Sequence, residues 1–501
     1  MPGTSSPATA EPAATGGNSR HTPAGDGSTL RRTWVDADGD GRLQPGAGEP
    51  LVDRTRLGEP EPLTRELARF AHITDAHVLD ASSPARVPFL ARFGPPLHST
   101  FRPQEALTAQ VLHGAINAVR AQRPQLVIQG GDLIDNAQHN ELEQALALLG
   151  GGRVAPGSGP DGYFGVQLAR NPDAFYYRPE IDPPRHPGLL ERAVTSFTSP
   201  GVGTDWLPVL GDHDALVGGE LVPSAVTQRL ATGDRALWEM PANLRLPPGL
   251  ELSSTALADG PDPSVVEAFV EQALAGPTVR VPPDRRRGEL LFAELIARQW
   301  DASHAAAQPL QSGGAAASPP PLLDYVRDLG DGLRVIVLDL IRRGGGSSGL
   351  VHADQPAWLE RQLASAADRW VILVTHQPLE DVTGAAPLLE LLDRSPRVVA
   401  ALAGHTHRNR IIPRETPAGG YWLITTCSLI DFPQQCRALR LCATPGGGVA
   451  LETWMLDHVQ VGPLGPISRE LAYLDAGAGR AGHLTGTIRD RNARLFRRAP
   501  S

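Results

Sequence analysis

Short apolar runs alternate with helical repeats along the chain between about residues 66 and 408. The helical repeat is clearest over 103–123, where apolar side chains recur every three or four residues. Further helices are predicted over 139–149, 353–366 and 386–393. The apolar runs predict buried strands at 69–75, 126–132, 206–211, 333–340, 370–376 and 398–403. Strands that alternate with helices in this way indicate an α/β layered domain.

The pattern changes beyond residue 408 and is interrupted twice before it. The late segments predict antiparallel strands, at 408–414, 421–430, 437–443 and 449–456. The first interruption, 152–200, is rich in Pro, Gly and aromatic residues. The second, 217–330, contains helical pieces at 264–274 and 288–300. Both begin after strand ends, so we interpret them as insertions that cap one face of the domain.

The first residues of the chain are poor in apolar side chains. Residues 1–29 contain no Val, Ile, Leu or Phe, so they cannot bury enough apolar surface to order themselves. The predicted division of the chain is a disordered tail over 1–29, an N-terminal extension over 30–65, a main domain over 66–460 and a helical tail over 461–501. Arginine clusters at 285–287 and 495–498 are expected to lie on solvated faces.

Three alternating carboxylates, Asp36, Asp38 and Asp40, match the first half of a calcium loop of the EF-hand kind. Ala47 occupies the twelfth position, where such a loop needs a bidentate Glu, and Pro45 interrupts it. The segment is therefore either a calcium site or an Asp/Gly turn within an N-terminal hairpin, and the turn is favoured.

Charge and cysteine content narrow the class of protein. Acidic residues outnumber basic ones, 55 to 46, which gives a formal net charge of −9. This balance makes nucleic acid an unfavoured partner, since duplex binding needs a phosphate-neutralising surface, but a small phosphorylated substrate held by metal ions is compatible with it. The three cysteines, Cys427, Cys436 and Cys442, are too few for a disulfide framework and suit a reducing compartment. No apolar stretch reaches the roughly 18 residues of a membrane span, and no signal pattern is present, so we expect a cytoplasmic protein.

Five short polar motifs stand at the carboxyl ends of predicted strands. They are Asp75-Ala-His77, Gly131-Asp132-Leu-Ile-Asp135-Asn136, Gly211-Asp212-His213-Asp214, Thr375-His376 and Gly404-His405-Thr406-His407. Ligands gather at this edge of α/β sheets, and imidazole with carboxylate is a ligand set for divalent metals. Alternation puts both side chains of Asp-x-His and His-x-His on one side of an extended segment. The glycines before Asp132, Asp212 and His405 are expected to allow tight backbone turns.

This ordered set resembles the calcineurin-like metallophosphoesterase family over about residues 68–145, 206–216 and 333–435. Asn136-Ala-Gln-His-Asn-Glu141 and Ser428-Leu-Ile-Asp-Phe-Pro-Gln-Gln435 look most like bacterial members related to cyclic-nucleotide phosphodiesterases. The resemblance implies a sandwich of two mixed β-sheets flanked by helices, with insertions capping the active-site face. It also implies two divalent metal ions (Mn, Fe or Zn). One would be held by Asp75, His77 and His407 and the other by Asp212, His376 and His405, with Asp132 bridging both.

The resemblance further assigns roles around the metals. His213 would contact the phosphoryl oxygen or protonate the leaving group, with Asp135 orienting its other nitrogen. Asn136 would contact the phosphate. Other readings of nearby residues stay open: Asp135 as a helix cap, Asp431 and Gln434 in a turn or lining the pocket, and Gln138, His139 and Asn140 at a helix start facing solvent.

One position departs from the family, which usually has Asn where this chain has Asp212. The additional carboxylate should favour a harder metal such as Mn²⁺ or Fe. The implied activity is hydrolysis of a small phosphate ester, with a phosphodiester favoured, by in-line attack of a metal-bridging hydroxide. A phosphomonoesterase, a nuclease and a metal-binding scaffold with impaired turnover are the alternatives. The oligomeric state is not predicted.

Overall fold

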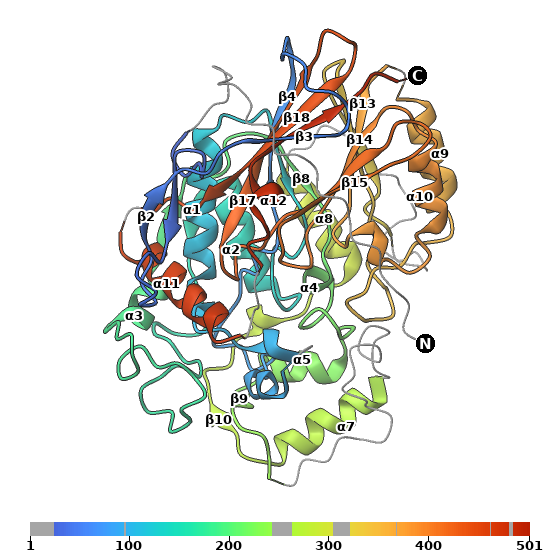
Figure 1. Ribbon diagram of the computed structural model, residues 1–501. Coiled ribbons are helices and arrows are strands. Elements are labelled where there is room, and N and C mark those ends of the chain that lie inside the picture. The colour runs from blue at the N-terminus through green and yellow to red at the C-terminus, as the bar shows by residue number, and fades with distance from the viewer. Residues whose placement is uncertain are drawn as a thin grey trace, which may run out of the picture.

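Two mixed β-sheets form the centre of the molecule (Figure 1). The computed structural model describes residues 25–94, 97–242, 263–303, 321–366, 368–460, 462–479 and 484–500. The first sheet has the order β3 (Val52–Leu57), β19 (Ala493–Arg497), β18 (Val449–Asp457), β17 (Gln435–Ala443), β4 (Glu66–Ile73), β5 (Leu126–Gln129) and β8 (Trp206–Pro208). The second has the order β11 (Tyr325–Leu329), β12 (Leu333–Val337), β13 (Trp370–Val374), β14 (Val398–Ala403), β16 (Tyr421–Thr425) and β15 (Arg410–Arg414).

The second sheet is buried on both faces. In β13, Ile372 packs in a core cluster shared with the first sheet, whereas Val371 and Leu373 pack in a cluster with the outer helices. Alternate residues of a strand face opposite sides, so a strand between two apolar layers needs an unbroken apolar run. This explains why the parallel strands are readable from the sequence.

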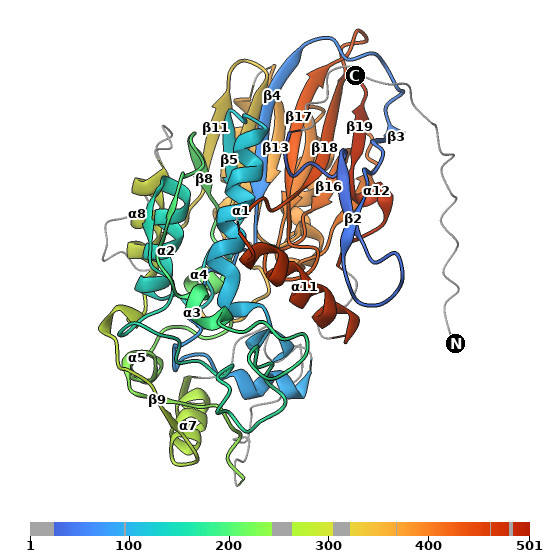
Figure 2. The ribbon, with the colours of Figure 1, turned by 90° about the vertical axis from the view of Figure 1, so that its left-hand side faces the viewer.

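Helices cover the outer faces of both sheets, as Figures 1 and 2 show. The first sheet carries α1 (Thr108–Ala121), α2 (His139–Gly150) and α11 (Leu464–Gly477), with α8 (Phe292–Ser303) near β8. The second sheet carries α9 (Gln355–Ala364) and α10 (Ala386–Asp393). The predicted fold class, an α/β sandwich of two mixed sheets flanked by helices, is confirmed.

The insertions contribute smaller elements, of which α5 (Ala225–Thr232), β9 (Arg235–Ala236), α7 (Pro263–Leu274) and β10 (Val279–Arg280) lie at the lower end of Figure 1. The others are α3 (Leu189–Ala193) and the strands β6 (Gly152–Val154) and β7 (Phe197–Ser199), which pack against α2. The Tyr176 hydroxyl donates to the backbone carbonyl of Trp238, which joins the first insertion to the second. Buried Arg287 donates to the Asp80 carboxylate and to Ser158, and so ties both insertions to the main domain.

The late strands pair as predicted, β15 antiparallel to β16 and β17 antiparallel to β18. The two pairs belong to different sheets, because β15 and β16 lie in the second sheet while β17 and β18 lie in the first. β15 lies at the edge of the second sheet. The next strand along the chain, β16, lies between β14 and β15. β16 is therefore antiparallel to β15 but parallel to β14.

The C-terminal segment and the arginine clusters differ from what the sequence predicts. The predicted helical tail contains α11 and α12 (Ile488–Arg491) but then forms β19, a strand inside the first sheet. Neither arginine cluster is wholly solvated, since Arg497 and Arg287 are buried. Arg497 donates to the carbonyls of Pro396 and Ala418. Backbone carbonyls thus satisfy a guanidinium that the charge pattern alone places in water.

The N-terminal predictions fare differently. Residues 1–24 of the predicted disordered tail lie outside the described residues, but Ser28 and Thr29 are buried against the end of β18 and Asn492. Asp36 lies in the turn of an antiparallel hairpin, β1 (Arg32–Val35) and β2 (Gln44–Ala47). Its carboxylate accepts from the backbone of Asp40 and Gly41, which confirms the predicted turn within a hairpin. Calcium binding by this segment stays an untested alternative. Among the described residues, none of the helices has the length and apolar character that crossing a bilayer requires.

Candidate metal centre

The predicted metal ligands come together where the strands end. The segments after β4, β5, β8, β13 and β14 place them in two groups that share Asp132. The first group is Asp75, His77, Asp132 and His407, and the second is Asp132, Asp212, His376 and His405. Within each group, one ligand atom per residue lies within 4.8 Å of every other. Asp132 therefore occupies the bridging place that the family resemblance implies.

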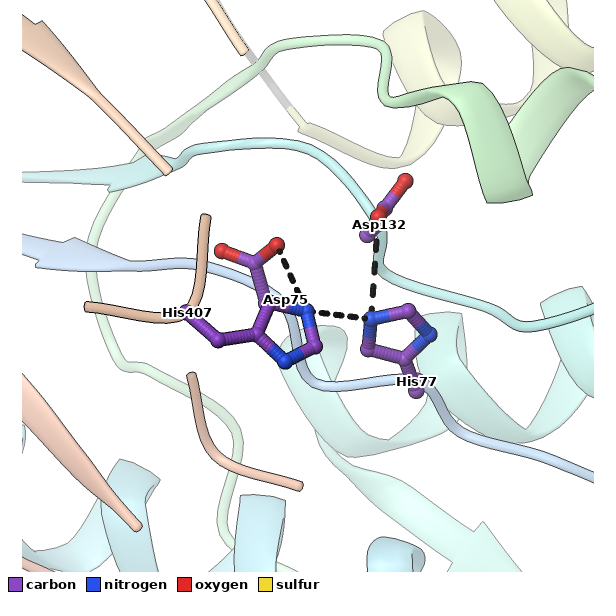
Figure 3. Close-up of side chains that lie close together, drawn as sticks. All are labelled: Asp75, His77, Asp132 and His407. Atoms are coloured by element: carbon purple, nitrogen blue, oxygen red, sulfur yellow. Dashed lines mark hydrogen bonds and ion pairs between the residues drawn. The ribbon is translucent and has the colours of Figure 1, made fainter. Parts of the chain in front are cut away.

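Figure 3 shows the first group. His407 Nε2 lies 3.3 Å from Asp75 Oδ1 and 3.2 Å from His77 Nε2. His77 Nε2 lies 3.6 Å from Asp132 Oδ2. Two donors that are each about 2.1 Å from one ion, at tetrahedral or octahedral angles, lie about 3.0–3.4 Å apart. The spacing of this group thus fits one divalent cation.

The second group has the same spacing. His376 Nε2 lies 3.2 Å from Asp132 Oδ2 and 3.2 Å from Asp212 Oδ1. His405 Nδ1 lies 3.1 Å from the same Asp212 oxygen. His376 Nε2 is buried and has no hydrogen-bond partner, which is costly unless a cation or proton meets it. The donor set, two imidazoles and two carboxylates, suits a divalent metal.

The hydrogen bonds on the far side of each imidazole fix which nitrogen faces the site. His77 Nδ1 lies 2.9 Å from Asp135 Oδ1, and His376 Nδ1 lies 2.9 Å from the Gly130 carbonyl. Because a carboxylate and a carbonyl only accept, each Nδ1 carries a proton, so each ring in its neutral form turns an Nε2 lone pair inward. Two lone pairs that face each other at 3.2 Å, as in His77 and His407, repel unless a cation or proton lies between them.

The charges of the site agree with this picture. Burial lowers the pKa of His407, but Asp431 and Asp75 outweigh it and raise that pKa to about 9. Burial likewise lowers the pKa of His376, and Asp132 and Asp212 raise it well above its ordinary value. Carboxylates thus draw a positive charge into both groups. A metal that binds there must displace these protons, so metal affinity will fall at low pH.

The ligands are held by a strained backbone. The residues Asp75, His77, Asp132, His405 and His407 all have φ between +43° and +64°. A non-glycine residue in this region costs about 1–3 kcal/mol, and such residues concentrate at functional sites. Five of the seven predicted ligands therefore share a conformation that packing alone seldom selects.

The glycines before the ligands act mainly by their size. A Cβ on Gly211 would collide with Asp132, and one on Gly404 would collide with Thr74 and Asp75. Only Gly131 also needs a positive φ, of +95°. All three glycines were expected to allow tight backbone turns. Gly211 and Gly404 instead let strand ends approach one another closely, because a side chain at either position would collide with a neighbouring strand end.

Asp135 and Asp431 each bind a histidine ring of the first group, on the side of the ring that faces away from that group. Asp135 Oδ1 lies 2.9 Å from His77 Nδ1, and Arg86 donates to Asp135 Oδ2 at 2.8 Å. Asp431 Oδ2 lies 2.6 Å from His407 Nδ1, and Arg102 donates to both Asp431 oxygens. Asp135 does not cap α2, whose N-cap is Gln138. The sequence reading missed Arg86 and Arg102, which stand outside every motif.

His213 stands beside the first group. Its Nδ1 lies 2.9 Å from the Asp135 carbonyl and 3.3 Å from Asp135 Oδ1, so Nδ1 carries a proton. Its ring meets that of His77 edge to face at 4.5 Å. Burial lowers the pKa of His213, but Asp132, Asp135 and Asp212 raise it to about 10. The ring is therefore oriented by Asp135, as expected, and favours the protonated form.

Asn136 is buried, and its amide nitrogen lies 3.0 Å from Asp135 Oδ2 and 3.3 Å from Glu141 Oε1. In this structure its donors hold the site together, and its contact with substrate stays a prediction. Gln138 and Asn140 do not face solvent as expected. They are buried and donate to Ser83 and Asp80, because the insertions cover the start of α2.

Oδ1 of Asp212 faces His376 and His405, and its role as a metal ligand stays a prediction. Gln377 Nε2 also donates to Asp212 Oδ1, at 3.2 Å. The second insertion begins against this residue. A Cβ on Gly219 would lie 2.6 Å from the His213 ring and 2.7 Å from Asp212 Oδ2. The space beside the two metal groups is therefore bounded by the segment that opens the insertion.

A few known proteins are similar to this chain in sequence or in structure. No protein-family model matches the chain. A cAMP/cGMP dual specificity phosphodiesterase of Mycobacterium tuberculosis is 38% identical over 86 residues, which cover 15% of this chain and 27% of that enzyme. The resemblance to calcineurin-like metallophosphoesterases is thereby confirmed. Because the match spans about a quarter of the enzyme's length, its activity enters below only as a proposal.

Three solved structures are similar at low sequence identity. A dimetal phosphatase from Danio rerio has a TM-score of 0.38 and 13% identity, covering 79% of this chain and 98% of its own. PhoD has a TM-score of 0.33 and 13% identity, covering 88% and 83%. The sulfate thiohydrolase SoxB from Thermus thermophilus has a TM-score of 0.30 and 14% identity, covering 84% and 62%. All three scores lie below 0.5, so the fold assignment rests on the sheet topology.

Proposed function

We propose that this chain is a two-metal hydrolase of phosphate esters that acts on a small phosphodiester. The observation that carries the proposal is the pair of ligand groups sharing Asp132, with His213 at their edge. The phosphodiesterase match favours a diester, and cyclic nucleotides are the first substrates to test. The net charge of −9 favours a small phosphorylated substrate over nucleic acid.

The metals proposed are Mn, Fe or Zn. When bound, two divalent cations lower the pKa of a coordinated water and stabilise negative charge on the phosphoryl oxygens. Asp75, His77 and His407 would hold one and Asp212, His376 and His405 the other. The three carboxylates of the centre, Asp75, Asp132 and Asp212, favour the harder Mn²⁺ or Fe over Zn²⁺.

The chain's own residues supply the proton and the orientation. His213 Nδ1 is tied to Asp135, which leaves Nε2 as the nitrogen available to donate to the leaving oxygen. The carboxylates around the ring keep it protonated at neutral pH before metals bind. Asp135 also orients His77, so one carboxylate sets both the proposed acid and a metal ligand.

The second insertion, 217–330, is proposed to select the substrate, because it opens at Gly219 against His213. The cytoplasmic location also stays a proposal. It rests on Cys427, Cys436 and Cys442, which are free and buried and thus suit a reducing compartment.

The test is hydrolysis by protein loaded with Mn²⁺. The substrates are bis-p-nitrophenyl phosphate, p-nitrophenyl phosphate, cAMP, cGMP and single-stranded DNA. His213→Gln should lower kcat on diesters by about 10²–10⁴-fold, the usual contribution of general acid catalysis. His113→Gln, at a half-buried histidine on α1, is the matched control and should leave kcat unchanged.

Three outcomes would replace the proposal. Faster turnover of the monoester than of any diester would favour a phosphomonoesterase, and preference for DNA would favour a nuclease. Two bound metals without turnover of any substrate would favour a scaffold.

A further inference from the structure

A separate cavity lies away from the metal centre, between the N-terminal hairpin and α11. The β1–β2 hairpin and α11 lie side by side in Figures 1 and 2. The cavity has a volume of about 320 Å³ and is lined by the segment Gly25–Arg32, by Trp34, by 457–460 and by Arg469 of α11. A second cavity of about 310 Å³ shares Trp34, Asp457 and Arg469 with it. Volumes of about 300 Å³ and above are typical of small-molecule sites.

Two buried polar side chains on this wall have unmet hydrogen-bonding atoms. His458 is 5% exposed, and neither of its ring nitrogens has a partner. Arg469 is 4% exposed; it donates from Nη2 to the His458 carbonyl, while its Nε has no partner. Native proteins satisfy nearly all buried polar groups, with protein or with a bound species. Asp457 attracts the Arg469 guanidinium electrostatically, but the Nε donor is still without a hydrogen-bond partner.

The cavity wall is positively charged and partly aromatic. It carries Arg31, Arg32 and Arg469 against Asp26 and Asp457, so three positive and two negative charges leave +1. The guanidinium carbons of Arg469 and Arg32 lie 4.6 Å and 5.4 Å from the Trp34 ring centroid. These contacts hold both arginines at the cavity, and the unpartnered Nε of Arg469 is a donor available to an anion. Burial lowers the pKa of His458, so its neutral ring offers one donor and one acceptor.

We propose that this cavity binds a small molecule bearing one oxyanion group, a phosphate or a carboxylate, through Arg32, Arg469 and His458. The net charge of +1 matches a single anionic group. Trp34 holds the two guanidinium groups at the cavity wall. The residues involved share no side chain with the metal centre, so this site does not depend on the proposed hydrolase activity.

The full-length chain, freed of metal with EDTA, tests the proposal without interference from the metal centre. Inorganic phosphate and acetate are titrated separately by calorimetry at low salt, which distinguishes phosphate from carboxylate recognition. We expect one saturable site for at least one anion, weakened about tenfold or more in Arg32→Ala and in Arg469→Gln. Arg56→Ala, at an exposed arginine paired with Glu415, should bind like the wild type.

Arg469 is buried and its variant can fail to fold, so Arg32→Ala, at an exposed position, decides in that case. Quenching of tryptophan fluorescence by the bound anion should also disappear in Trp34→Phe. Two results overturn the proposal: neither anion saturating up to about 10 mM, a concentration that detects millimolar affinity, or Arg32→Ala and Trp34→Phe both behaving as wild type.

Discussion

Replacing Asp431 should weaken both metal binding and folding. Its carboxylate is 3% exposed and serves two partners at once. Oδ2 lies 2.6 Å from His407 Nδ1, and both oxygens accept from Arg102, at 2.6 Å and 3.1 Å. Asp431→Asn keeps the shape and one acceptor but removes the charge. Asp431→Ala removes the carboxylate oxygens that accept from both His407 and Arg102.

The structure sets the size of each effect. Loss of a carboxylate behind a metal-binding histidine costs about 10–100-fold in metal affinity, or about 1.4–2.7 kcal/mol. Asp431→Asn should show this loss for one of the two metals. Both variants deprive buried Arg102 of its counter-ion, which costs about 3–5 kcal/mol of folding free energy, and Asp431→Ala also removes the acceptor that the Asn variant keeps.

Competition of the protein with a chelating dye for Mn²⁺ measures the affinity, and urea unfolding of metal-free protein measures the stability. Asp393→Asn is the matched control, since Asp393 also binds an arginine, Arg414, through both oxygens and lies outside both metal groups. Wild-type Mn²⁺ affinity in Asp431→Asn would refute the idea that this carboxylate holds His407 in a binding pose.

Substitutions at three further positions test the metal centre and the buried charges. Asp212→Asn should loosen the second metal and shift the lower limb of the pH–rate profile to lower pH, whereas Asp212→Ala should lower kcat by orders of magnitude; wild-type metal content and kcat in the Ala variant would show that Asp212 coordinates nothing. Arg287→Met should cost about 3–5 kcal/mol in urea unfolding, because it leaves the buried Asp80 carboxylate without its arginine; a loss below about 1 kcal/mol would contradict this. Burial raises the pKa of Asp324 to about 7 from 3.8, so the folded chain holds a proton that the unfolded chain releases, and the free energy of unfolding should fall as pH rises from about 4 to about 7. Asp324→Asn should flatten that slope in urea titrations, and an unchanged slope would exclude this group as its source.

The buried parallel strands and the ligands at their ends could be predicted from the sequence. Both are local signals, because an unbroken apolar run such as 370–376 marks a strand buried on two faces. The motif after each run then places its polar side chains at the sheet edge. Sheet membership is not a local signal. The sequence therefore does not predict that β15 and β16 lie in one sheet while β17 and β18 lie in the other.

The residues behind the ligands were harder to find. Arg102 reaches Asp431 across 329 positions of the chain, and no local pattern marks it. Charge alone places Arg287 and Arg497 on the surface, whereas the fold buries both. Each donates to groups far away in sequence, which only the fold brings near.

The proposed function requires two metal sites that share Asp132. Anomalous scattering from crystals soaked with Mn²⁺, combined with metal analysis of the same protein, measures the number of bound ions and the distance between them. We predict two ions per chain, about 3.5–4 Å apart, the usual separation in two-metal sites. We further predict that His405→Ala loses one ion, while Asp132→Asn weakens both. A single ion, or two ions unaffected by Asp132→Asn, would contradict the proposal.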